Sequence, residues 1–156
     1  MRILVTGITG FVGGHLAEHL LDRGDEVAGC SRTGRWPNEL RHLSDRIELI
    51  PCDLTQIVPA RSLFDQRQYD AVIHLAGIAS PRACAAAPAE AERQNVRATS
   101  VLVDAMRPHG QPPRLLLVSS SYVYGTPDPK RLPIGTDSPI KPDTIYGKTK
   151  WEAETS

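Results

Sequence analysis

A tyrosine and a lysine stand four residues apart near the end of the chain, in the segment Tyr146-Gly147-Lys148-Thr149-Lys150. Residues with this spacing share one face of a helix. A lysine ammonium beside a tyrosine stabilises the phenolate, so the phenol can pass a proton to or from a substrate oxygen. The spacing is common on solvated helix surfaces, so its interpretation depends on the rest of the chain.

A glycine-rich segment near the N-terminus predicts the other half of the chemistry. Its glycines directly follow a β-rich run at residues 2–6 and precede a helical pattern, a position that favours a dinucleotide site over a merely structural turn. Glycines there allow a tight turn, a close approach of the backbone to a pyrophosphate and close helix packing, while the helix N-terminus offers free N–H groups to the phosphates. The residues of this predicted phosphate cradle are Gly7, Thr9, Gly10, Phe11, Val12 and Gly13.

The end of the second predicted strand bears on the choice of nicotinamide cofactor. A carboxylate about 20 residues beyond the glycines would bind ribose hydroxyls and favour NAD. Ser31 and Arg32 stand there instead, and a guanidinium suits a 2′-phosphate. We therefore predict NADP as the cofactor, with NAD as the alternative if Arg32 is only a solvated loop residue.

Apolar runs alternate with helical patterns along the whole chain. The runs are continuous rather than alternating, which predicts parallel strands buried on both faces. The expected fold is a single α/β domain over residues 1–156, a Rossmann-type doubly wound parallel sheet that binds NAD(P). Strands are predicted at 2–6, 26–31, 46–50, 70–75 and 114–119, and helices at 11–23, at 55–67 with Thr55 as its cap, at 85–106 with Pro88 near its start or breaking it, and from 145 onward.

Composition excludes some classes of protein. The 18 basic and 18 acidic residues leave no net charge, so nothing global favours nucleic acid or an anionic membrane surface. No apolar run approaches the ~20 residues of a membrane helix, and we expect a cytoplasmic protein. Cys30, Cys52 and Cys84 lack zinc-site spacing and are expected to be reduced thiols buried near strand ends.

At the level of motifs, the chain resembles the extended short-chain dehydrogenase/reductase family of nucleotide-sugar epimerases, dehydratases and reductases. The cradle has the spacing Gly-x-x-Gly-x-x-Gly with Phe-Val inside. The matching pieces follow in the family's order and cover essentially the whole chain, but only the N-terminal part of the family's pattern. They are Thr6–Gly13, Asp53-Leu54, His74-Leu75-Ala76-Gly77, Asn95-Val96, the segment from Ser119 to Gly125, and Tyr146–Lys150.

The resemblance implies further cofactor contacts. Asp53 and Leu54 are expected against the adenine, and Leu75, Ala76 and Gly77 along the cofactor after the fourth strand. Asn95 is expected to organise water and backbone at the active site. Tyr146 and Lys150 are expected to contact the nicotinamide ribose as well as to take part in catalysis.

The resemblance also implies a catalytic hydroxyl five residues before Gly125, at Ser120. The family's dehydratases carry an acidic residue three before this glycine, often with another just before it. Tyr122 and Ser121 occupy these positions, which disfavours dehydration. The expected function is an NAD(P)-dependent epimerase or reductase that acts by hydride transfer on a nucleotide sugar.

Several alternatives stay open at this point. The last predicted helix has no glycine or proline from Lys150 to Thr155 that would end it, which favours a fragment. The sheet is then expected to be incomplete at its C-terminal side and the substrate-binding part to be absent. A non-catalytic dinucleotide-binding module, a 4,6-dehydratase relative lacking the acidic pair, and an enzyme acting on an unrelated ketone are the competing interpretations. A homodimer through helices including the one with Tyr146 is also expected.

Overall fold

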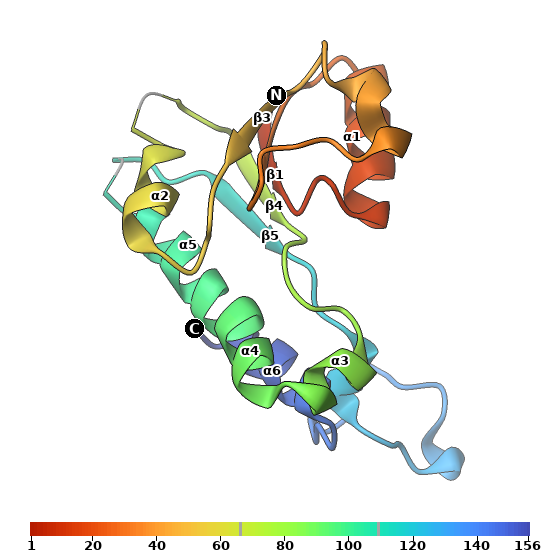
Figure 1. Ribbon diagram of the computed structural model, residues 1–156. Helices are drawn as coiled ribbons and strands as arrows, with labels where there is room; N and C mark the ends of the chain where they lie inside the picture. Colours follow the sequence, from red (N-terminus) through yellow and green to blue (C-terminus); the bar gives the residue numbers. More distant parts are fainter. Residues whose placement is uncertain (66, 109) are drawn as a thin grey trace.

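The computed structural model describes residues 1–65, 67–108 and 110–156 and shows a five-stranded parallel sheet with helices on both faces (Figure 1). The strand order is β3-β2-β1-β4-β5, with every neighbouring pair parallel. This confirms the predicted Rossmann-type fold. The strands are β1 (Arg2–Thr6), β2 (Glu26–Ser31), β3 (Glu48–Pro51), β4 (Ala71–His74) and β5 (Arg114–Leu117).

Helices cover the two faces of the sheet unequally. The α-helices are α1 (Phe11–Asp22), α2 (Ile57–Ser62), α3 (Pro81–Ala86), α4 (Pro88–Glu92), α5 (Ala98–Met106) and α6 (Ile145–Glu154). The other helical elements are η1 (Asn38–Leu43), the π-helical η2 (Arg93–Arg97), η3 (Ser121–Tyr124) and η4 (Pro129–Arg131). No helix within the described ranges is both long and apolar enough to cross a membrane.

Successive residues of β1 pack into two separate hydrophobic cores, one on each face of the sheet, because side chains alternate across a strand. Ile3 and Val5 pack with Leu20 of α1 on one face. Leu4 packs with Leu102 of α5 on the other face, where α2 also lies. The chain therefore switches faces between β1 and β4, and parallel sheets bind ligands at the carboxyl ends of the strands at such a switch point.

The second predicted helix is shorter than expected, and its cap was wrongly assigned. α2 begins at Ile57, and Gln56 stands at its N-cap without a side-chain bond. Thr55 instead donates its backbone N–H and its hydroxyl to Asp53 Oδ1, at 3.0 and 2.8 Å, which closes a turn before the helix. Part of the remaining predicted stretch, residue 66, lies outside the described residues.

The long predicted helix 85–106 is broken into pieces. It begins earlier, at Pro81, where Ser80 Oγ accepts a hydrogen bond from Ala83 N at 3.2 Å. Ala87 leaves the helical region at φ −140° and ψ 71°, because the proline that follows disfavours helical backbone before it. A π-helical turn at η2 then precedes α5, and such turns are frequent at functional sites.

Several observed strand bounds also differ from the predicted ones by one or two residues. The third strand begins at Glu48 rather than Arg46, since Ile47 N still bonds to Leu43 O in the preceding turn. β4 and β5 end at His74 and Leu117, before the residues predicted. The loop at 125–142 contains the short η4 and is fastened to the start of α6 by Asp143, which accepts from Thr126 N at 3.0 Å.

Candidate functional site

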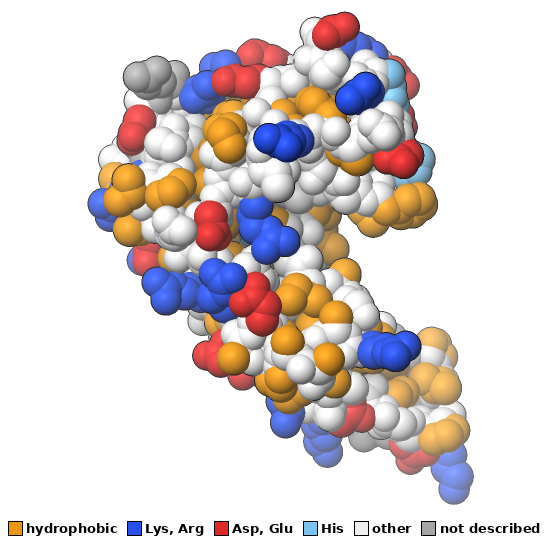
Figure 2. Space-filling model, in the orientation of Figure 1, with side chains coloured by type: hydrophobic (Ala, Val, Ile, Leu, Met, Phe, Trp, Pro, Cys, Tyr) orange, Lys and Arg blue, Asp and Glu red, His pale blue; other side chains and the backbone are white. Residues whose placement is uncertain are grey.

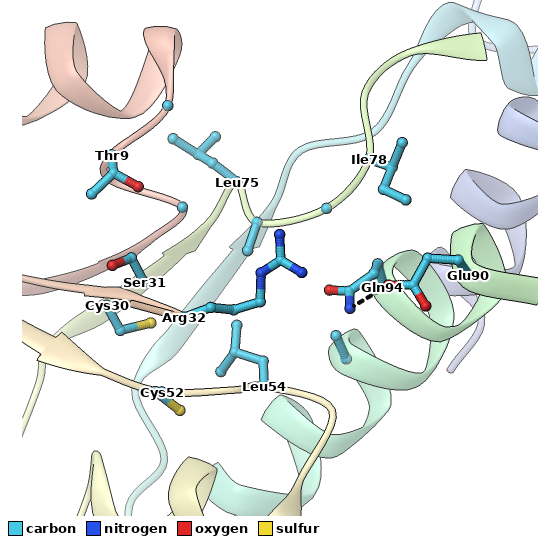
Figure 3. A pocket seen from close by; sticks show the side chains of 15 residues that line it. Thr9, Cys30, Ser31, Arg32, Cys52, Leu54, Leu75, Ile78, Glu90 and Gln94 are labelled. Atoms are coloured by element: carbon cyan, nitrogen blue, oxygen red, sulfur yellow. Dashed lines mark hydrogen bonds between the residues drawn. The ribbon is translucent and has the colours of Figure 1, made fainter. Parts of the chain in front are cut away.

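A pocket of about 500 Å³ opens at the carboxyl ends of β1, β2 and β4, at the switch point of the sheet (Figure 3). In the space-filling view the surface is hollowed between the sheet with α1 and the part built by α3, α4 and α6 (Figure 2). The pocket is lined by Gly7, Thr9, Gly10, Cys30, Ser31, Arg32, Cys52, Leu54, Leu75, Ala76, Gly77, Ile78, Glu90, Gln94 and Ala98.

The predicted phosphate cradle forms one wall of this pocket. Gly7 has φ +69°, and a Cβ there would lie 2.8 Å from Ala76 N, so this position requires glycine. A Cβ on Gly13 would lie 2.4 Å from Gly7 O, so the start of α1 packs directly on the loop. Gly10 is the N-cap of α1 and supplies no side-chain cap. The first amides of α1 are therefore placed for an anion, which fits the pyrophosphate of a dinucleotide.

Arg32 reaches from the end of β2 into the middle of the pocket (Figure 3). Leu54 and Leu75 lie on either side of it, and Gln94 and Glu90 lie opposite. Hydrogen bonds from Arg93 and Gln94 lower the pKa of the Glu90 carboxyl, and the charge of Arg32 adds to this effect. Arg32 is thus a cation inside the pocket that faces a carboxylate on the far wall.

Ser31 and Asp53 shape the pocket through their turns. Ser31 Oγ accepts from Gly34 N at 3.1 Å and so fixes the turn after β2. The Asp53 carboxylate is held by Thr55 and Gln56, and the hydrogen bond from Thr55 N is the main cause that lowers its pKa. Asp53 does not line the pocket, but its turn places Leu54 on the wall.

Asn95 joins the pocket to α6. Buried in η2, it accepts from Ile78 N at 2.7 Å and donates to Ile78 O at 3.2 Å and to Thr149 Oγ1 at 3.0 Å. A Cβ on Gly77 would lie 2.6 Å from Asn95 Oδ1, so the amide also presses on the pocket wall. Asn95 therefore fixes both the wall after β4 and the middle of α6.

Tyr146 and Lys150 lie on one face of α6, as their spacing predicts. Thr144 caps this helix, since its Oγ1 accepts from Gly147 N at 3.0 Å. Tyr146 is 9% exposed, with its ring edge-on to Tyr122 at 5.5 Å between centroids. Loss of hydration lowers the pKa of Lys150, and the nearby Glu154 carboxylate partly opposes this.

Ser120 stands on the neighbouring element rather than on α6. It caps η3, where its Oγ accepts from Tyr122 N at 3.3 Å. η3 packs against α6 so closely that a Cβ on Gly147 would lie 2.4 Å from Tyr122 O. Ser119 instead donates its hydroxyl hydrogen to the Glu154 carboxylate at the end of α6. The fold therefore brings the three predicted catalytic side chains onto two packed elements.

Most predicted cofactor residues line the pocket, but not all of them do. Gly13, Asn95, Tyr146 and Lys150 are not among the lining residues, and Phe11 and Val12 expose their side chains, at 83% and 60%. Only the backbone of Phe11 and Val12 belongs to the cradle. The apolar side chains of Phe11 and Val12 do not indicate from the sequence that only their backbone lies at the cradle.

The pocket also has walls that the sequence did not predict, namely Cys30, Cys52, Ile78, Glu90, Gln94 and Ala98. Gln94 and Ala98 are spaced as one helix face beside Asn95, and this spacing was the available signal. All three cysteines are free and buried, as expected. Cys84, however, lies in α3 and not near a strand end.

Comparison with known proteins places this geometry in a family. The model of the NAD dependent epimerase/dehydratase family matches residues 3–156. The chain is 30% identical over 155 residues to UDP-glucose 4-epimerase of Bacillus subtilis (strain 168), covering 96% of this chain and 45% of that protein. It is 35% identical over 161 residues to UDP-glucuronic acid decarboxylase 1 of Arabidopsis thaliana, covering 99% of this chain and 35% of the relative.

Solved structures agree. The UDP-glucose 4-epimerase from Bifidobacterium longum, in complex with NAD+ and UDP, superposes with a TM-score of 0.88 at 28% identity, over 99% of this chain and 47% of that one. The UDP-glucose 4-epimerase from Brucella ovis, in complex with NAD, gives 0.86 at 29% identity, over 99% and 46%. The chain spans about half the length of the epimerases it matches. Given a family match over nearly all of its length and a glycine cradle at the switch point, the chain belongs to the NAD dependent epimerase/dehydratase family, among the extended short-chain dehydrogenases/reductases.

Proposed function

We propose that this chain is the cofactor-binding and catalytic part of an NAD(P)-dependent epimerase or reductase that acts by hydride transfer on a nucleotide sugar. The observation that carries this proposal is that a dinucleotide-type pocket and the helix with the predicted catalytic pair are joined in one structure. A glycine cradle walls a pocket at the switch point, and Asn95 connects that pocket by hydrogen bonds to the helix with Tyr146 and Lys150.

The residues present fit a dinucleotide. The cradle from Gly7 to Gly13 would hold the pyrophosphate, and Leu54 would contact the adenine beside Arg32. The wall from Leu75 to Gly77 would line the cofactor toward α6. Bound nicotinamide would supply the acceptor or donor of a hydride for a sugar carbon.

The chain's own side chains would move the proton. The Tyr146 phenol would exchange a proton with the oxygen on the reacting sugar carbon, while the ammonium of Lys150 favours the phenolate. The Ser120 hydroxyl would hold the same oxygen by a hydrogen bond. In an epimerase the oxidised sugar is then reduced from its other face, whereas in a reductase only the reduction occurs.

For the cofactor we propose NADP rather than NAD. The cation of Arg32 inside the pocket suits a 2′-phosphate, and the pocket wall at the end of β2 carries Ser31 in place of a carboxylate. The solved epimerases named above contain NAD, so NAD is the alternative for this chain.

Other readings follow from particular observations. A dinucleotide-binding module without catalysis is the second candidate, because the glycine cradle and pocket account for cofactor binding by themselves. Ser121 and Tyr122 on the exposed side of η3 are compatible with a dehydratase relative that has lost its acids. We further propose a cytoplasmic protein and a homodimer through α6.

The test is a binding and turnover experiment on residues 1–156. We expect calorimetry to show binding of NADP(H), and steady-state assays with a panel of nucleotide sugars to show little turnover, because remote substrate contacts are needed to orient the sugar. Turnover on the order of 1–10³ s⁻¹ would mean that this length of chain is a complete enzyme. Failure to bind either nicotinamide dinucleotide would refute the proposal itself.

A further inference from the structure

A chain of buried hydrogen bonds crosses the protein behind the pocket. Thr6, His74 and Thr99 are each at most 2% exposed. Thr6 Oγ1 lies 2.6 Å from His74 Nδ1, and His74 Nε2 lies 3.1 Å from Thr99 Oγ1. None of these three side chains lines the pocket, and the proposed reaction does not use them.

The backbone carbonyl of Asn95, at the Thr99 end of these hydrogen bonds, fixes which nitrogen of His74 carries a proton. Ala76 N donates to Thr6 Oγ1 at 3.2 Å, so the Thr6 hydroxyl is free to donate to His74 Nδ1. At the other end Thr99 Oγ1 donates to the Asn95 carbonyl at 2.7 Å, so it accepts from His74 Nε2. His74 Nε2 therefore carries a proton, and in the neutral ring the unprotonated Nδ1 accepts from the Thr6 hydroxyl.

This series of hydrogen bonds connects the phosphate cradle, the facing pocket wall and α6, which have to be aligned for the proposed reaction. Thr6 immediately precedes Gly7 of the cradle, and Ala76 belongs to the facing pocket wall. Thr99 fastens the carbonyl of Asn95, whose side chain holds Thr149 of α6. Through Thr149, which donates to Tyr146 O at 2.9 Å, the connection reaches the predicted proton donor's own backbone.

We propose that His74 is a positioning residue for this site: as a neutral imidazole protonated on Nε2, it holds the phosphate cradle and the Asn95 segment in a fixed relation and thereby places α6 against the cofactor pocket. The inference rests on the proposed function for its meaning, although the hydrogen-bond chain itself does not.

The electrostatic surroundings agree with a neutral ring. Burial and, to a smaller extent, the positive charge of Lys150 on α6 together lower the pKa of His74 to about 4. An imidazolium would place an N–H at Nδ1, where the Thr6 hydroxyl already donates. The charged form is therefore disfavoured by burial and by Lys150, and the neutral form is the one that accepts from Thr6.

The test follows the amides of α6 by hydrogen exchange, with NADP+ as the probe. In the wild type we expect NADP+ to slow exchange both at the cradle and along residues 147–153, by about tenfold or more. His74→Phe and Thr99→Val should keep the slowing at the cradle and lose it in α6. His74→Gln, whose amide nitrogen can reach Thr99, should restore part of it.

Several outcomes separate the ideas. If NADP+ still slows hydrogen exchange in α6 in both His74→Phe and Thr99→Val, the positioning role of His74 is overturned. If the Phe variant does not fold, the result for Thr99→Val decides alone. Nitrogen NMR that finds the proton of His74 on Nδ1 would also overturn it. Absence of slowing at the cradle in the wild type would contradict the proposed function instead. His19→Gln, an exposed histidine on α1, is the matched control and should behave as the wild type.

Discussion

Arg32 is the residue on which the choice of cofactor depends. If its guanidinium binds a 2′-phosphate, Arg32→Ala should weaken NADPH binding by about 1.5–3 kcal/mol, the range for a hydrogen bond to a charged group. Binding of NADH should change little. Arg41→Ala, an exposed arginine of η1 that does not line the pocket, serves as the control. Tighter binding of NADH than of NADPH by the unmodified chain would overturn the NADP assignment.

Tyr146 is the proposed proton donor, and its phenol can be removed without removing its ring. In an active form of the protein, Tyr146→Phe should lower turnover by about 10²–10⁴-fold, the usual contribution of a positioned acid or base. The ring contact with Tyr122 should persist, so cofactor affinity should stay nearly unchanged. Turnover equal to that of the wild type would exclude the role, and Tyr124→Phe on η3 is the matched control.

His74 predicts how stability depends on pH. Its pKa is lowered to about 4 in the folded protein from an ordinary value near 6.5, so the unfolded chain binds the proton more readily between these values. The contribution of neutral His74 to the free energy of unfolding is fully present above about pH 6.5 and is lost as the pH falls toward 4. The loss amounts to about 2–3 kcal/mol at pH 4.5.

Urea unfolding at pH 7.5 and pH 4.5 measures this dependence. His74→Gln should be less stable than the wild type at pH 7.5, and its loss of stability between the two pH values should be smaller by about the same 2–3 kcal/mol. An unchanged pH dependence in this variant would show that His74 is not buried as a neutral ring.

At the scale of elements, the sequence predicted what local chemistry determines. The apolar runs and the glycines fixed the number of strands, the parallel sheet and the position of α1. Pro88 is a predicted break, and Ser80 with Pro81 was a local signal for the helix start that the prediction did not use. The π-helical turn has no such signal, because it depends on how Asn95 reaches Ile78 and Thr149. Pocket walls such as Glu90 and Gln94 were missed for the same reason: which face of a helix meets the cofactor is a matter of tertiary packing.

The junction of β1 and α1 gives a prediction at this scale. Gly13→Ala adds a methyl group that would lie 2.4 Å from Gly7 O and 2.6 Å from Ile8 Cα, both backbone atoms that cannot rotate away. We expect α1 to shift, with a loss of stability of about 1–3 kcal/mol, as for overpacking elsewhere, and with weaker dinucleotide binding.

Thermal unfolding and a NADP+ titration check this prediction. Gly14→Ala is the control, because its added Cβ would meet only the side chain of Leu40, which can adjust. Equal stability and affinity in the two variants would show that the cradle is looser than the structure indicates.

At the scale of the whole molecule, the position of β5 at an edge of the sheet bears most on self-association. β5 is an edge strand, and α1 packs on β1 and β2, so the α1 side of the sheet is open beside β5. Leu116, paired with Ile73 on this side, is 54% exposed, and Val118 beyond it is 40% exposed. An exposed edge with apolar side chains is a template for association, and the absence of net charge removes a general repulsion between molecules.

We therefore expect residues 1–156 to self-associate at high concentration, through the edge and open face of β5. Leu116→Lys should reduce this association, because a charge on the open face must be desolvated when a second copy docks. Val58→Lys adds the same charge on the exposed surface of α2, where Val58 is 76% exposed, and should leave association unchanged. Sedimentation velocity over a range of concentrations measures both. If Leu116→Lys associates as strongly as the wild type, the edge of β5 is not the site. Loss of association in Val58→Lys would then indicate the α2 face, and no loss in either variant would agree with the α6 homodimer proposed above.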